Sequence, residues 1–130
     1  MNVLWDLMKP HGRLPNLALI DVRDVARALV AALTAPPASQ VGRKRIPTCV
    51  PSVQASDVAD LIKKERPELA HRLPLEAIKA APQVGALTAN ERLKEVLGLE
   101  VTDWRTTILE SLDALVRLED HWKARGMPIY

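Results

Sequence analysis

Only two short stretches of this chain have the length and apolar character of β-strands. They are residues 17–22 and residues 45–50, and a segment with helical periodicity separates them. Because Pro47 cannot donate to a ladder of hydrogen bonds, the second stretch would be an edge strand or one with an irregular start. Two strands do not form a stable sheet by themselves, and a strand–helix–strand unit joins an existing parallel sheet. We therefore predict an α/β piece with an incomplete sheet.

Helical periodicity dominates the rest of the sequence and predicts about five helices. We expect them at residues 1–9, from Asp24 to the Pro36-Pro37 pair, from the Pro51-Ser52 pair to Pro67, from Asn90 as N-cap to Gly98, and from Thr102 or Asp103 to Gly126. Residues 38–42 are expected to form a loop, and residues 68–84 a loop with short helical turns. The predicted architecture is thus mostly helical, with two short strands.

Apolar stripes predict which face of three helices is buried. In the helix that begins at Asp24, the expected core face consists of Val25, Ala28, Leu29, Ala32 and Leu33. In the next helix it consists of Val58, Leu61 and Ile62, with Lys63, Lys64 and Glu65 outside. In the closing helix, the stripe consists of Trp104, Ile108, Leu112, Leu115 and Trp122.

Composition excludes several classes of protein. The 130 residues are 48% apolar and 26% charged, which is typical of a globular chain. The formal net charge of +2 is too small for a dedicated nucleic-acid binder, and the basic cluster of residues 43–45 has no aromatic residues interleaved. No apolar run approaches the roughly 18 residues that a membrane span requires. We expect a cytoplasmic protein that binds neither nucleic acid nor membranes.

The spacing of the histidines and the single cysteine does not favour a metal site or a reactive thiol. His11, His71 and His121 are scattered, and none has ligands at metal-binding spacing on both sides. The single cysteine, Cys49, lies in an apolar run and is expected to pack as a small apolar residue. We therefore predict no metal site.

The most distinctive charged segment is residues 21–24, which flank a predicted strand-to-helix turn. Two readings stay open: a helix cap with an ion pair, or a ligand-facing loop at the carboxyl end of a strand. A phosphate-binding loop is excluded, because the five glycines are dispersed along the chain. The only tyrosine is the last residue, Tyr130, so no tyrosine inside the sequence can act as an acid.

Several segments, taken in order, resemble the C-terminal portion of extended short-chain dehydrogenases/reductases, the NAD-dependent epimerase/dehydratase family. They are Asp-Val-Arg-Asp-Val-Ala at residues 21–26, then residues 42–46, 56–62, 90–98 and 102–118. Leu-Ala-Leu at residues 17–19 stands where nucleotide-sugar epimerases carry Arg-Asp-Phe. The sequence therefore resembles more closely the dihydroflavonol, cinnamoyl-CoA and methylglyoxal-type reductases.

The resemblance implies a Rossmann-type oxidoreductase that reduces aldehydes or ketones with NADP(H) or NAD(H). The family's Gly-rich turn and Tyr-x-x-x-Lys are absent here, so no catalytic or cofactor-binding residue carries over. Residues 1–130 would be a single partial domain, inactive alone, that binds no cofactor by itself. Trp5, Met8, Leu17 and Asp21 are the residues expected to face a substrate, with ordinary packing as their alternative.

Two kinds of partner follow from this interpretation. One is the missing N-terminal cofactor-binding part, and the other is a second copy bound through exposed apolar surface. The alternative function is a non-catalytic helical interaction module derived from the same lobe.

Overall fold

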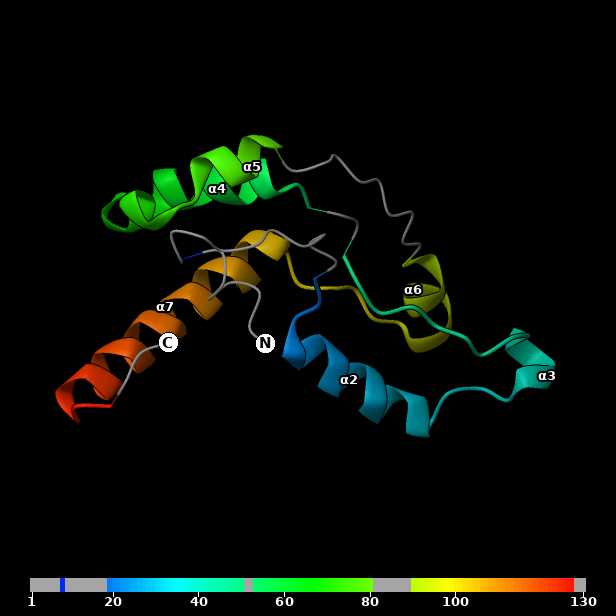
Figure 1. The fold of residues 1–130 in the computed structure, drawn as a ribbon. Coiled ribbons are helices and arrows are strands. Elements are labelled where there is room, and N and C mark those ends of the chain that lie inside the picture. The colour runs from blue at the N-terminus through cyan, green and yellow to red at the C-terminus, as the bar shows by residue number, and fades with distance from the viewer. Residues whose placement is uncertain (1–7, 9–18, 51–52, 81–89, 128–130) are drawn as a thin grey trace. The chain divides into compact units, whose positions relative to one another are not determined.

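The computed structural model describes residues 8, 19–50, 53–80 and 90–127, and within them it is mostly helical (Figure 1). The helices are α2 (Val22–Leu33), α3 (Ala38–Val41), α4 (Ala55–Glu65), the 3-10 helix η1 (Pro67–Arg72), α5 (Leu75–Ala80), α6 (Glu91–Leu97) and α7 (Trp104–Ala124). They fall into two compact units that alternate along the chain. Unit 1 contains α4, η1, α5 and all of α7 but its first residue, and unit 2 contains α2, α3 and α6. The single partial domain stays a prediction.

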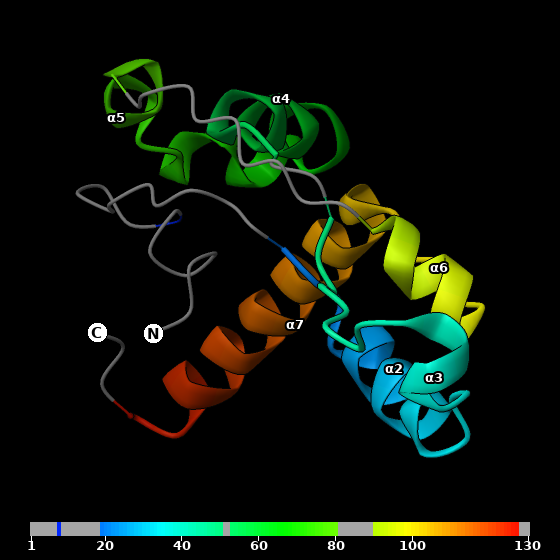
Figure 2. The same ribbon diagram turned by 90° about the vertical axis from the view of Figure 1, so that its right-hand side faces the viewer.

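The core of unit 1 is built on α4, which contacts both η1 and α5 (Figures 1 and 2). Val58 and Ile62 are fully buried, as predicted, while Leu61 is only partly buried. Lys63, Lys64 and Glu65 are exposed, and the helix ends at Glu65, ahead of Pro67. Proline disfavours helical conformation in the residue before it, which accounts for this boundary. The predicted turns of residues 68–84 correspond to η1 and α5.

The closing helix, α7, is one continuous helix (Figure 2). Ile108 and Leu112 are completely buried, whereas the two tryptophans and Leu115 of the stripe are partly buried. The apolar periodicity did not predict the burial of Glu119. This residue lies one turn after Leu115 on the same stripe and is only 7% exposed. Its carboxylate accepts a hydrogen bond from Arg72 of η1 at 2.8 Å and pairs with Lys123 at 2.7 Å. A buried charge is tolerated here because it is paired twice.

A second ion pair connects the end of α4 to α7 within unit 1. The Arg66 guanidinium donates from Nε and from a terminal nitrogen to the two oxygens of Asp113, at 2.8 and 2.7 Å. This two-point geometry fixes direction as well as distance, which a lysine could not do. The fork hydrogen bonds raise the pKa of Arg66 and lower that of Asp113.

The two predicted strands of unit 2 are not confirmed. Leu17 and Ala18 lie outside the described residues, Leu19 to Asp21 have no strand assignment, and Val22 already belongs to α2. Residues 45–50 are likewise without strand assignment. Among the described residues, the Val50 N–H donates a backbone hydrogen bond to the Leu19 carbonyl at 2.8 Å and so joins the two segments. Pro47 has no N–H to extend this contact, and a ladder needs further strands to become stable.

The predicted core face of α2 is wrong in part. The helix begins at Val22 instead of Asp24, because Asp21 is its N-cap. The buried residues of α2 are Asp24 and Ala28, whereas Leu29 and Leu33, assigned to the core by the sequence, are 67% and 84% exposed. The hydrogen bonds of Asp24 determine which face of the helix turns inward, against its apolar periodicity.

Short elements complete unit 2. The predicted loop at residues 38–42 contains the helical turn α3. Helix α6 has the predicted bounds and ends at Gly98, whose φ of 63° is the left-handed conformation that glycine adopts most readily. Asn90 precedes α6 but makes no side-chain cap; its Oδ1 accepts from the Cys49 N–H at 3.4 Å. Of the predicted helix at residues 1–9, only Met8 lies in the described part, where it is buried.

We expect Glu119→Ala to lower the free energy of unfolding by about 2–3 kcal/mol, because the Arg72 guanidinium would lose its buried partner. Chemical denaturation followed by circular dichroism measures this loss. Asp120→Ala is the matched control, since it removes the same charge from an exposed position of the same helix; it should change stability by no more than about 0.5 kcal/mol. Equal losses in the two variants would contradict the structural role of Glu119.

Candidate functional site

The turn into α2 carries the charged cluster that the sequence singled out. Asp21 is 4% exposed and caps the helix: its Oδ1 accepts from the Arg23 backbone N–H at 2.9 Å. The same carboxylate accepts from Nε and a terminal nitrogen of the Arg23 side chain, at 2.9 and 2.7 Å. An N-cap carboxylate satisfies an otherwise unpaired N–H and complements the helix dipole.

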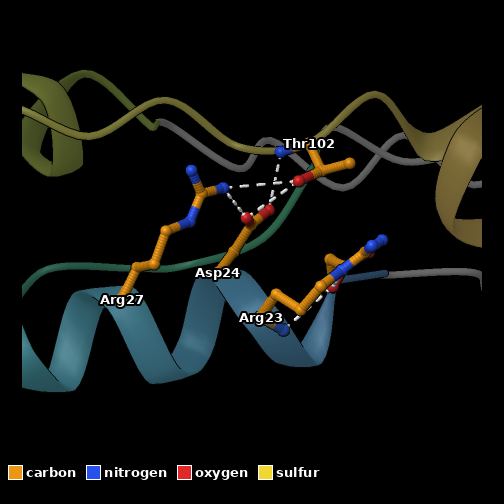
Figure 3. A network of polar contacts seen from close by, with 5 residues as sticks. Arg23, Asp24, Arg27 and Thr102 are labelled. Atoms are coloured by element: carbon orange, nitrogen blue, oxygen red, sulfur yellow. Dashed lines mark hydrogen bonds and ion pairs between the residues drawn. The ribbon is translucent and has the colours of Figure 1, made fainter.

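Asp24 makes a polar contact within unit 2 that spans 78 residues of the sequence (Figure 3). Its Oδ2 accepts from the Thr102 backbone N–H at 2.6 Å, and its Oδ1 accepts from the Thr102 hydroxyl at 2.9 Å. Arg27, one turn along α2, also donates to Oδ1. One buried carboxylate therefore joins α2 to the extended segment that precedes α7.

The protonation of Asp24 follows from these contacts. Burial alone raises the pKa of the carboxyl group. Hydrogen bonds from the Thr102 N–H, from Arg27 and from the Thr102 hydroxyl more than offset this, so the pKa of Asp24 lies below its ordinary value. Asp24 is thus a carboxylate at neutral pH, suited to hold structure and poorly suited to donate a proton.

The geometry supports the cap-and-ion-pair reading of residues 21–24. Both oxygens of Asp21 and both oxygens of Asp24 accept hydrogen bonds within the chain. The arginine side chains of the cluster, Arg23 and Arg27, are more than half exposed and hold the carboxylates from outside. The sequence predicted only that Asp24 complements the helix dipole. The contact between Asp24 and Thr102 could not be predicted from local sequence patterns, because 78 residues separate the two.

Of the four residues expected to face a substrate, two lie in the described part of the chain, one in each unit. Met8 is buried in unit 1 and Asp21 is buried in unit 2. Trp5 and Leu17 lie outside the described residues. The substrate-facing role of all four stays a prediction.

A shallow depression of about 360 Å³ lies beside α6. Its lining residues are Asn90, Glu91, Leu93, Lys94, Leu99, Glu100 and Val101. Two of the charged groups pair with each other, the Lys94 ammonium donating to the Glu100 carboxylate. This contact raises the pKa of Lys94 and lowers that of Glu100. The volume would suit a small ligand, but these two charges are committed to one another.

Arg92 of α6 is a second residue that sequence reasoning missed. Its guanidinium donates to the Val41 and Arg43 carbonyls, at 2.7 and 2.8 Å, and so holds the start of the basic cluster of residues 43–45 against α6. Arginine on a short amphipathic helix ordinarily indicates only a solvated face, so no sequence pattern distinguished it. The side chains of the basic cluster are exposed.

The histidines and the cysteine form no metal or catalytic cluster in the part of the chain that the structure describes. His71 and His121 are exposed, His11 lies outside that part, and Cys49 is partly buried. Across the described ranges, no three His, Cys, Asp or Glu residues are grouped so that they could hold a metal ion. The helices of these ranges include none that is long and apolar enough to span a bilayer.

We expect Asp24→Ala to destabilise the protein by about 2–3 kcal/mol, since it leaves the Thr102 N–H without its charged acceptor. Asp60→Ala is the control. Asp60 pairs with Lys63 on an exposed face of α4, so its loss should cost no more than about 0.5 kcal/mol. Urea denaturation of the three proteins gives the comparison, and a loss below 1 kcal/mol for the Asp24 variant would contradict the assigned role.

Stability should fall in acid, and Asp24 should account for part of the fall. Its pKa is lower in the folded state than in the unfolded state, where aspartate titrates near about 3.9. The unfolded chain therefore binds more protons in acid, so the stabilisation is complete above that value and is lost as the pH falls through the folded-state pKa. Thermal unfolding between about pH 6 and pH 3 should show a smaller decrease in Tm for Asp24→Asn than for the unchanged protein; parallel curves would contradict this.

Comparison with solved structures shows the fold to which these units belong. The chain superimposes on the crystal structure of yeast methylglyoxal/isovaleraldehyde reductase Gre2 complexed with NADPH, with a TM-score of 0.65 and 24% sequence identity. No protein-family model and no curated protein matches the sequence.

The structural match covers very different shares of the two chains. It covers 92% of this chain and 40% of the yeast reductase, so the chain spans less than half of that protein's length. The predicted resemblance to one portion of a Rossmann-type reductase is therefore confirmed at the level of the fold.

Proposed function

We propose that this chain is the substrate-binding part of an NAD(P)-dependent reductase of aldehydes or ketones, and that it is inactive without a cofactor-binding part. The observation that carries the proposal is the fold: nearly all of the chain matches a reductase, while more than half of that reductase has no counterpart here. The sequence resemblance to the C-terminal portion of such enzymes points the same way.

The residues present do not fit a dinucleotide. In the described ranges, the three glycines with positive φ, Gly42, Gly98 and Gly126, follow helix C-termini, whereas a pyrophosphate loop needs glycine ahead of a helix N-terminus. The start of α2 is already occupied by the Asp21 carboxylate, and Asp24 lies in its first turn. Two negative charges at a helix N-terminus disfavour a bound pyrophosphate. No chemical step is therefore assigned to this chain.

An alternative function is a non-catalytic interaction module that retains the shape of the lobe. The observation that favours it is the exposed apolar side of α2, where Val22 and Leu33 are 78% and 84% exposed. Size-exclusion chromatography with light scattering distinguishes the two functions. A stable oligomer of uniform size would favour the module, and aggregation would favour an incomplete reductase.

The purified chain should neither bind NADPH nor oxidise it in the presence of methylglyoxal or isovaleraldehyde. NADPH fluorescence measures binding, and absorbance of the nicotinamide measures turnover, with the yeast reductase as positive control. A rate that copurifies with the chain through successive columns would contradict the proposal. So would saturable NADPH binding, because the positive-φ glycines of the described ranges follow helix C-termini and form no pyrophosphate loop.

A further inference from the structure

A long segment, most of which lies in unit 2, has no acidic residue. Residues 25–56 include Arg27, Arg43, Lys44 and Arg45, but neither aspartate nor glutamate. The whole chain has a formal net charge of +2, so part of this positive charge is balanced elsewhere in the sequence. Charge is therefore distributed unevenly along the chain, and the basic cluster of residues 43–45 is the densest basic part of the segment.

The other cations of unit 2 are paired with carboxylates. The four ion pairs are Arg23–Asp21, Arg27–Asp24, Arg92–Glu95 and Lys94–Glu100. By contrast, the three side chains of the basic cluster are exposed, and in the described part of the chain none of these side chains forms a hydrogen bond or an ion pair. The basic cluster therefore keeps three positive charges available at the surface of unit 2.

Backbone contacts on both sides hold the basic cluster in place. The Arg92 guanidinium donates to the carbonyls of Val41 and Arg43, at 2.7 and 2.8 Å. Further along the segment, the Cys49 N–H donates to the Asn90 side chain at 3.4 Å. A binding segment whose backbone is already fixed loses less conformational entropy when a partner binds. The three charges are thus presented on a fixed backbone.

We infer that the basic cluster is a docking surface for an acidic segment of a partner protein, one that carries closely spaced carboxylates. This inference does not depend on the proposed function. An arginine can bind a carboxylate through two parallel hydrogen bonds, and the basic cluster has two arginines with a lysine between them. Three residues span only about 10 Å, which matches a short stretch of peptide with two or three carboxylates.

Other polyanions fit the basic cluster less well. Recognition of anionic lipid surfaces uses clusters of about four to eight Lys or Arg residues. Basic motifs for nucleic acid contain about five to eight residues. Single-stranded nucleic acid is also bound by stacking of its bases on aromatic side chains, and residues 25–56 contain none. The small size of the cluster and its composition favour protein carboxylates over a phosphate polymer.

Fluorescence anisotropy of a labelled hexaglutamate peptide tests the inference. The titration uses the full chain at about 50 mM salt, because higher ionic strength screens exposed charges. We expect saturable binding with a Kd below about 1 mM. The triple variant Arg43→Gln, Lys44→Gln, Arg45→Gln should weaken this binding at least about fivefold, because it loses three charge-assisted contacts.

The triple variant Lys63→Gln, Lys64→Gln, Lys79→Gln is the matched control. It removes the same amount of charge from exposed lysines that already pair with carboxylates in unit 1. The affinity for the peptide should change less than about twofold. Equal weakening in the two triple variants would overturn the inference, because binding would then follow the net charge of the chain alone.

Three further results would also overturn the inference. The first is a titration that shows no saturation up to about 1 mM. The second is tighter binding of a six-nucleotide single strand of DNA, or of phosphatidylserine vesicles, than of the peptide, since the partner would then belong to another class. The third is a decrease in Tm of more than about 4 °C in the variant of the basic cluster, which would show that these side chains serve the fold.

Discussion

The carboxylate of Asp24 is the interaction on which the arrangement of unit 2 depends. It joins α2 to the segment before α7 through the backbone and hydroxyl of Thr102, across 78 residues of sequence. Because the carboxylate is buried and charged, these donors must stay in place, and the face of α2 that bears it must point inward. Leu29 and Leu33, on the other side of α2, are exposed.

A buried carboxylate has a similar effect in unit 1. Glu119 lies on the apolar stripe of α7 and is held by Arg72 and Lys123. Apolar contacts tolerate small shifts along a helix, whereas a paired charge is satisfied in one position only. Glu119 therefore fixes the register between η1 and α7, in addition to any stability that the pair contributes.

The described residues form the helical part of a reductase fold without a sheet. The Val50–Leu19 hydrogen bond joins the two segments expected to be strands. Two short strands do not form a stable ladder without further strands, which is consistent with the absence of a strand assignment for these two segments.

The sequence by itself determined the helices with strong local signals. Val58 and Ile62 marked the core of α4, Gly98 ended α6, and Ile108 and Leu112 marked the buried stripe of α7. Periodicity, prolines and a left-handed glycine act over a few residues, so a single sequence reveals them. Only the tertiary structure decided three outcomes. Leu29 faces outward, the Asn90 side chain accepts from the Cys49 N–H in place of capping α6, and the Asp24 carboxylate accepts from the N–H and hydroxyl of Thr102. Those outcomes depend on hydrogen bonds between segments far apart in the chain, and local periodicity carries no information about them.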